Sequence, residues 1–112
     1  MKRLARLALA FLFATMVACD GGVILHGELV DPSGKEMESC RLNLYSKPED
    51  ELLDSISVQG RFDELITVSP WLRRCYAVVS CRGAQDAFRS QVYEVGSEPL
   101  DLGRITFKRT AP

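Results

Sequence analysis

The residue types best suited to chemistry in this sequence are four cysteines and a single histidine. A thiol, as in Cys19, Cys40, Cys75 and Cys81, can be acylated, oxidised to a disulfide or used as a nucleophile. His26 is the only imidazole, and no motif pairs it with a serine or cysteine nucleophile. Because an enzyme needs such a group of residues, the sequence predicts a non-catalytic protein in which His26 is packed or solvated within a strand.

A cluster of carboxylates is the main candidate for a metal site, and it consists of Glu49, Asp50, Glu51 and Asp54. Calcium takes several carboxylate oxygens, but the alternating spacing and the glycine of an EF-hand loop are missing here. The sequence also has no paired CxxC motifs for zinc and no glycine-rich loop for phosphate. We therefore expect a solvated acidic loop, and we expect the protein to use no metal and no cofactor.

Cys19 follows an N-terminal segment with an unusual composition. Three basic residues stand among the first six positions, and residues 7–18 carry no charge. This layout is typical of a secretory signal peptide. The apolar run is about 12 residues long, whereas a membrane-spanning helix needs about 20. We therefore expect residues 1–18 to be a cleaved signal peptide.

The stretch "MVAC" at 16–19 resembles the lipobox of bacterial lipoproteins, in which an apolar, a small or β-branched and a small residue precede cysteine. In that family the sulfur is joined to a diacylglycerol, the chain is cut just before the cysteine, and the new α-amine is usually acylated. The resemblance implies that Cys19 carries lipid and anchors the protein on a membrane of the bacterial envelope, with residues 19–22 as a short tether. Asp20 resembles an inner-membrane retention signal, but the choice between inner and outer membrane stays open. The alternative is an ordinary secretory signal cut after Ala18, with an incidental thiol next to it.

Removal of the leader would change the charge balance of the chain. The whole sequence has 14 basic and 15 acidic residues, so without the three basic residues of the leader it keeps 14 − 3 = 11 basic residues and a net charge of −4. An acidic domain lacks the basic surface that binds nucleic acid or anionic headgroups. We expect neither of these as a partner.

The rest of the chain alternates between β-rich runs and turn residues. Seven short runs have the pattern of strands and no helical period, namely residues 23–30, 40–45, 52–58, 61–68, 75–81, 90–95 and 102–107. Residues 46–55 indicate a helical turn or an acidic loop, because Ser46 and Glu49 have the spacing of a capping box. The pattern predicts one all-β domain over residues 23–108, an antiparallel seven-stranded β-sandwich.

Three stretches of this domain form an ordered pattern: "GELVDPSGKEMESCRLNL" from Gly27, "GRF" at 60–62 and "LDLGRITF" at 100–107. Their order and spacing resemble the carboxypeptidase regulatory-like pattern, which is part of the transthyretin-like β-sandwich group. The resemblance implies that the strands at 40–45 and 75–81 lie side by side and antiparallel.

Three cysteines remain once the first is lipidated, and they would lie outside the cytoplasm, where disulfides persist. Cys75 and Cys81 are about 20 Å apart along one extended strand, and a disulfide needs Cα atoms within about 7 Å. Cys40 is therefore the shared partner of either one, unless all three thiols are free. The transthyretin-like resemblance implies a Cys40–Cys81 bond with Cys75 buried and free. It also places two further pairs opposite one another, Leu42 with Val79 and Leu44 with Ala77.

Trp71 is the only tryptophan, and Arg73 and Arg74 follow it closely. Trp and Arg are enriched at binding hot spots, so these three residues are the candidate interaction surface. The sequence nevertheless favours a different role for Trp71, which is to close the end of the sandwich core.

These expectations combine into a lipid-anchored envelope protein whose domain is a non-catalytic binding or structural module. Its partner would be another envelope protein or a cell-wall component, held through strand edges or the Trp71 end. The alternative is an accessory or inhibitor lipoprotein subunit of a secretion or transport machine. A hydrolase is a distant third choice.

Overall fold

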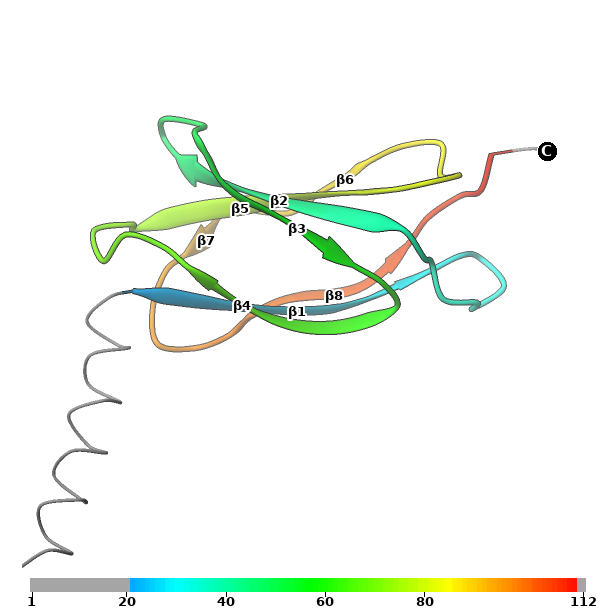
Figure 1. The fold of residues 1–112 in the computed structure, drawn as a ribbon, viewed down its shortest axis with the longest axis horizontal. Coiled ribbons are helices and arrows are strands. Elements are labelled where there is room, and N and C mark those ends of the chain that lie inside the picture. Colours follow the sequence, from blue (N-terminus) through cyan, green and yellow to red (C-terminus); the bar gives the residue numbers. More distant parts are fainter. Residues whose placement is uncertain (1–20, 111–112) are drawn as a thin grey trace, which may run out of the picture.

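The structure is a computed structural model that describes residues 21–110, and in it the chain forms two β-sheets lying face to face (Figure 1). The smaller sheet has the order β4 (Arg61–Thr67), β1 (Gly22–Val30) and β8 (Leu100–Thr106). The larger sheet has the order β3 (Leu52–Val58), β2 (Cys40–Lys47), β5 (Arg74–Cys81) and β6 (Phe88–Arg89). A further strand, β7 (Tyr93–Glu94), pairs with β5. The expected signal peptide and Cys19 lie outside the described residues.

The described residues form strands and turns without a helix, which confirms the all-β prediction for this part of the chain. Within residues 21–110 no helix is long and apolar enough to cross a bilayer.

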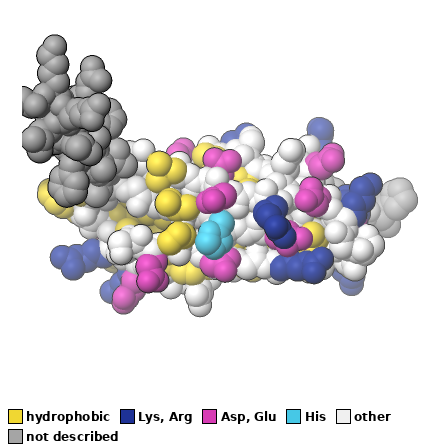
Figure 2. Space-filling model, turned by 90° about the horizontal axis from the view of Figure 1, so that it is seen from below, with side chains coloured by type: hydrophobic (Ala, Val, Ile, Leu, Met, Phe, Trp, Pro, Cys, Tyr) yellow, Lys and Arg dark blue, Asp and Glu magenta, His cyan; other side chains and the backbone are white. Residues whose placement is uncertain are grey.

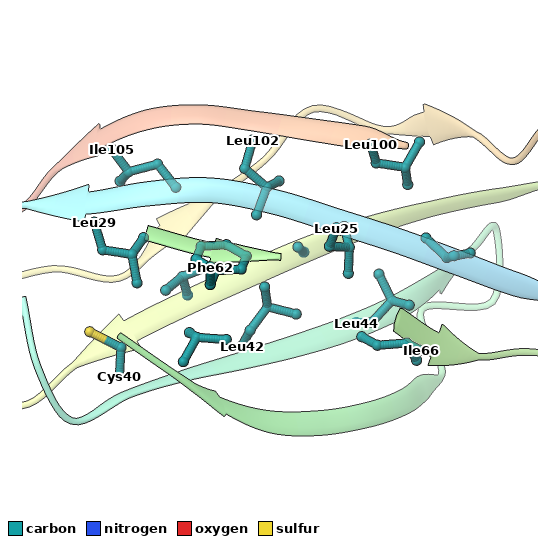
Figure 3. Packing of buried hydrophobic residues seen from close by; sticks show 14 of the residues in the cluster. Leu25, Leu29, Cys40, Leu42, Leu44, Phe62, Ile66, Leu100, Leu102 and Ile105 are labelled. Atoms are coloured by element: carbon teal, nitrogen blue, oxygen red, sulfur yellow. The ribbon is translucent and has the colours of Figure 1, made fainter. Parts of the chain in front are cut away.

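The core lies between the two sheets, where the inward side chains of both meet (Figure 3). In β2 every second residue is buried, as the alternation in the sequence predicts. The fully buried side chains of the larger sheet include Leu42, Leu44 and Val79, and those of the smaller sheet include Leu25, Leu29 and Ile66.

Truncation of Leu42 tests this core. Leu42→Ala is expected to lower the free energy of unfolding by about 2–4 kcal/mol, because it removes buried apolar surface and leaves a cavity. Leu52→Ala is the matched control, since the same change falls on a side chain that is 52% exposed. Its cost should be about 0.5 kcal/mol or less. Urea unfolding of both variants measures the difference, and equal losses would contradict the packing of Leu42.

The smaller sheet departs from the antiparallel prediction, because β1 and β8 run parallel. Alternation in a sequence reports which side of a strand is buried, but it does not report the direction of the neighbouring strand. The pair also contains a bulge beside Gly103, whose φ of +72° favours glycine and whose N–H donates to the Asp101 carboxylate at 2.8 Å.

Of the strand predicted at 90–95 only β7 forms, and the separate short strand β6 precedes it, so the described residues have eight strands instead of seven. Val79 pairs with Phe88 whereas Cys75 pairs with Tyr93, and this is a register shift of one residue along the same edge of β5. Between the two parts, the hydroxyl of Ser90 accepts the Ala77 N–H at 2.9 Å, where a strand would use a backbone carbonyl. The break is therefore a local bulge in one edge strand.

Residues 46–55 contain no helical turn, so only the loop interpretation of this segment holds. Strand β2 continues to Lys47, and β3 begins at Leu52. The Ser46 hydroxyl accepts the N–H of Glu51 at 3.2 Å, so the residue predicted to cap a helix instead closes a hairpin loop. The capping-box pattern reflects the tendency of serine to accept local backbone N–H groups, which turns and helices share.

A buried carboxylate joins the turn after β1 to the end of the chain. Asp31 accepts hydrogen bonds from Ser33 and Lys35 and from the Arg109 guanidinium, the last at 2.7 Å. The bond from the Ser33 hydroxyl, followed by that from Arg109, holds the pKa of Asp31 well below its usual range. The turn at 31–34, predicted from its Asp-Pro-Ser-Gly sequence, is thus also an attachment point for the C-terminal segment.

Candidate functional site

The loop between β4 and β5, residues 68–73, carries Trp71 in a tight turn. The Ser69 carbonyl accepts the N–H of Leu72 at 3.1 Å, and the Ser69 hydroxyl accepts the N–H of Trp71 at 3.2 Å. Pro70 occupies the second position of this turn, where a fixed φ is favourable. The turn therefore holds the tryptophan in a defined position on the surface.

The indole of Trp71 points away from the core and is 82% exposed. The prediction that it closes the end of the sandwich is therefore wrong. Its neighbour Leu72 is half-buried and packs against the core instead. Trp71 and Leu72 are adjacent apolar residues in one turn, and only one of them can point inward. Their hydrophobicity alone does not indicate which one is buried.

Both ends of this loop are attached to other parts of the sandwich. The N–H of Val68 donates to the Gly21 carbonyl at 3.3 Å, and the N–H of Val95 donates to the Arg73 carbonyl at 2.8 Å. Gly21 has a φ of +80°, and a Cβ built on it would lie 2.5 Å from the Val68 carbonyl oxygen, so the close approach requires glycine. The Trp71 turn thus lies directly beside the first described residue of the chain.

Arg73 and Arg74 follow the turn and are both exposed. Among residues 21–110 the ion pairs are Lys47–Asp50, Arg61–Glu28 and Arg109–Asp31, and Asp101 has His26 as its neighbour, so no carboxylate pairs with either guanidinium. Together with Trp71 they border an open concavity of about 670 Å³ that extends to Glu94 and Val95. The structure therefore brings together all three residues of the candidate interaction surface.

A second surface feature, an aromatic and charged cluster, lies on the outer face of the larger sheet. The rings of Tyr45 and Tyr76 stack with centroids 5.3 Å apart, and the Arg89 guanidinium lies 4.3 Å from the Tyr76 ring centre. The Tyr76 hydroxyl donates to Asp50 at 3.1 Å, and Lys47 donates to the same oxygen at 2.8 Å. Burial, followed by the bond to Asp50, raises the pKa of Tyr76, whereas the bond from Lys47 lowers the pKa of Asp50.

The sequence did not predict this cluster. Tyr45 falls on the polar side of the alternation at 40–45, which is a signal for exposure. Tyr76 stands in an apolar run where both sides of the strand look buried. Only the register, which sets Tyr45 opposite Tyr76, brings the two rings together.

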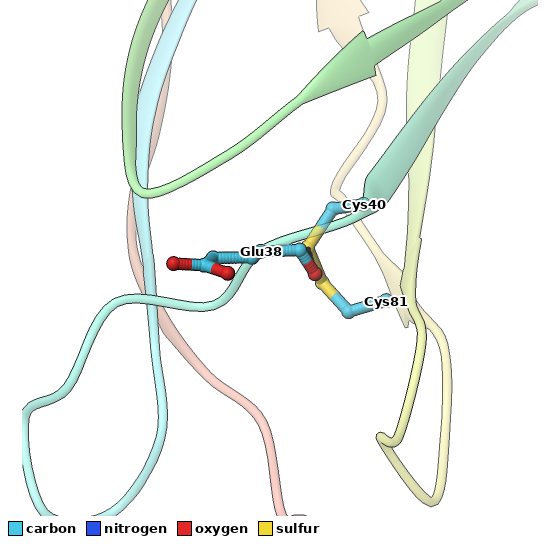
Figure 4. Close-up of a disulfide and its surroundings, with 3 residues drawn as sticks. All are labelled: Glu38, Cys40 and Cys81. Carbon is cyan, nitrogen blue, oxygen red and sulfur yellow. Dashed lines mark hydrogen bonds between the residues drawn. A yellow bond between two sulfur atoms is a disulfide. The ribbon is translucent and has the colours of Figure 1, made fainter.

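The predicted disulfide is present between Cys40 and Cys81 (Figure 4). The two residues pair across β2 and β5 with Cα atoms 3.9 Å apart. The register that the resemblance implied is also confirmed, since the remaining predicted neighbours pair as expected, Leu42 with Val79 and Leu44 with Ala77. The disulfide thus links the start of β2 covalently to the end of β5 within the larger sheet.

Cys75 is buried and free, as the resemblance implied. Burial raises the pKa of its thiol to about 11, so almost none of it is the reactive thiolate at neutral pH. In the structure this residue acts as a small apolar side chain of the core.

His26 lies on the outer face of the smaller sheet, 3.4 Å from the Asp101 carboxylate, and both side chains are partly exposed. The surrounding concavity of about 320 Å³ is lined by glycines, charged residues and Phe62, without a serine, threonine or cysteine. No cluster of three or more His, Cys, Asp or Glu residues in metal-binding positions occurs within residues 21–110.

Comparison with known proteins gives no relative: no protein-family model matches the chain, and no curated protein shows significant sequence similarity to it.

Proposed function

We propose that this protein is a lipid-anchored lipoprotein of the bacterial envelope whose sandwich is a non-catalytic binding module. The proposal assigns lipid attachment to Cys19, together with removal of residues 1–18. It assigns the domain to the transthyretin-like group with carboxypeptidase regulatory-like features, which the two facing sheets and the paired strands β2 and β5 support.

The observation that carries this proposal is the position at which the sandwich begins. Strand β1 starts at Gly22, and Gly21 already accepts a hydrogen bond from Val68. The described sandwich thus reaches to within two positions of Cys19, close behind the lipobox-like stretch. In this arrangement the residue at the cleavage site lies next to a folded domain that remains once the leader is gone.

The Cys40–Cys81 disulfide supports a location outside the cytoplasm. Structural disulfides form and persist in oxidising compartments and are rare where glutathione keeps thiols reduced. The disulfide that joins the central strands β2 and β5 is therefore consistent with an exported domain.

The binding surface that we propose is the outer face of the larger sheet, around Tyr45 and Tyr76. The stacked rings and the bonds among Lys47, Asp50 and Tyr76 hold these side chains in one arrangement, which reduces the entropy lost on binding. Among the ion pairs of residues 21–110, no carboxylate pairs with Arg89. We expect a partner with acidic groups, either an envelope protein or a cell-wall component.

Site-specific photocrosslinking tests this binding function. A photoreactive residue in place of Ser80, which is exposed on β5 beside this face, should give a discrete adduct in intact cells. The same residue in place of Glu64, which is exposed on β4 of the other sheet, should not give that adduct. Absence of an adduct at Ser80, or an identical pattern from both positions, would contradict binding at this face.

Mass spectrometry of the adduct separates the two forms of the proposal. A single envelope protein or a cell-wall fragment would support an independent binding module. A component of a secretion or transport complex would support the alternative, an accessory or inhibitor subunit of that machine.

A further inference from the structure

The exposed large hydrophobic side chains of residues 21–110 all lie in one half of the sandwich. They are Ile24, Leu52, Leu65, Trp71 and Val92. On the smaller sheet Ile24 pairs with Leu65, close to the start of β1. Figure 2 shows hydrophobic side chains gathered on this half of the face and charged ones dominating the other half. Scattered exposed hydrophobics are normal, but their restriction to one end indicates a contact there.

This apolar half is the half that contains Gly21. The register places Gly22 opposite Thr67, and the chain then runs through the Trp71 turn to Arg74 at the start of β5. On the larger sheet Lys47 pairs with Arg74, so the loop that precedes Leu52 lies at the same end. The Trp71 turn and Gly21 therefore lie at the same end of the described domain.

The short tether between Cys19 and Gly21 limits how far this end of the domain can lie from the lipid anchor. Cys19 precedes Gly21 by two positions, and two residues span at most about 7 Å when fully extended. If Cys19 is acylated, as the proposed function requires, the Trp71 end cannot leave the immediate surface of the bilayer. Side chains at this end would then meet the headgroup region of the lipids.

We propose that the Trp71 turn inserts into the interface of the bilayer that holds the lipid anchor. Tryptophan is enriched at membrane interfaces because its ring is apolar and its N–H can still be hydrated. Arg73 and Arg74, which have no ion-pair partner among residues 21–110, can place their guanidinium groups at the lipid phosphates. The hydrogen-bonded turn presents Trp71 in a fixed position, so little further ordering is needed.

We expect burial of apolar side chains to drive this contact, and not electrostatic attraction to anionic lipid. The net charge of −4 without the leader opposes binding to a negative surface, whereas phosphatidylcholine also offers phosphate groups and an apolar interface. The insertion is thus expected in bilayers that carry no net charge. It would orient the domain, with the Trp71 end toward the lipid and the turn at 31–34 away from it.

The fluorescence of Trp71 provides a direct test, because it is the only tryptophan in the chain. The full acylated protein is reconstituted into phosphatidylcholine vesicles, with and without bromine on the upper part of the acyl chains. We expect flotation with the vesicles, a blue-shifted emission, strong quenching by the brominated lipid and several-fold weaker quenching by aqueous acrylamide than in urea-unfolded protein.

The matched control moves the tryptophan to the opposite end through Trp71→Phe combined with Arg82→Trp. Arg82 is exposed in the turn that follows Cys81. This variant should float equally well, but its fluorescence should be insensitive to bromine and accessible to acrylamide. Equal bromine quenching at both positions would overturn the orientation that we propose.

Flotation separates failure of the inference from failure of the anchor. Protein that floats while Trp71 remains unquenched would overturn the interfacial insertion and leave the anchor intact. Protein that does not float would overturn both proposals. Protection of Trp71 from acrylamide in native envelopes but not in lipid vesicles would assign the turn to a protein partner and would also overturn the insertion.

Discussion

Simultaneous replacement of Cys40 and Cys81 by alanine is expected to lower the free energy of unfolding by about 4 kcal/mol, since the disulfide closes a loop of roughly 40 residues. The bond joins positions 41 residues apart and therefore restricts a large part of the unfolded chain. Both side chains are buried, so alanine avoids introducing an unpaired polar group. Thermal or urea unfolding without reductant measures the loss.

Cys75→Ala is the matched control for this experiment. It removes a buried thiol of the same strand and leaves the disulfide intact, so its cost should be that of a small cavity. Reductant should destabilise the wild type and Cys75→Ala but not the double variant. A double variant as stable as the wild type, or a Cys40–Cys75 crosslink in peptide mapping, would contradict the bond as the structure shows it.

The second large effect is expected at Cys19. Cys19→Ala should block lipid transfer to the chain, and the precursor should then accumulate with its N-terminal segment uncleaved. The mature wild type, in contrast, should partition into membranes and require detergent for release, because two or three acyl chains give stable anchoring. Cys75→Ala should be processed as the wild type is.

Electrophoretic mobility and membrane fractionation of these variants distinguish the two interpretations of the leader. An ordinary secretory signal cut after Ala18 would still be removed from Cys19→Ala. The variant would then be found as a soluble protein of mature size, and the lipoprotein assignment would be wrong.

Much of the larger sheet could be predicted from the sequence. The alternation at 40–45 indicated which side chains of that strand point inward, and the resemblance supplied its antiparallel neighbour at 75–81. The residues alone left Cys75 and Cys81 as alternative partners of Cys40, and the resemblance implied Cys81. Alternation placed all three cysteines on the inward side, and the antiparallel register implied by the resemblance selected the pair.

Other features depend on contacts that local patterns do not encode. The parallel pair β1 and β8 joins the first and last strands of the domain sequence. The bulge at Ser90 depends on one hydrogen bond between its side chain and the Ala77 N–H. The exposure of Trp71 follows from the shape of a turn whose inward position is taken by Leu72. Tyr45 and Tyr76 become a cluster only through cross-strand register.

The pattern of exposed residues gives the domain two distinct surfaces in this account. The end that contains Gly21 and Trp71 would face the lipid, and the outer face of the larger sheet, on which half-buried Tyr45 covers buried Tyr76, would face a partner. Both assignments depend on the attachment of the chain to a membrane through its N-terminal cysteine.

Metabolic labelling with an alkyne fatty acid tests that attachment most directly. Cells expressing the wild-type protein and cells expressing Cys19→Ala are labelled, the protein is isolated, and the alkyne is detected by coupling to a fluorophore. We expect strong labelling of the wild type and none of Cys19→Ala. Equal labelling of the two proteins, or no labelling of the wild type, would contradict it.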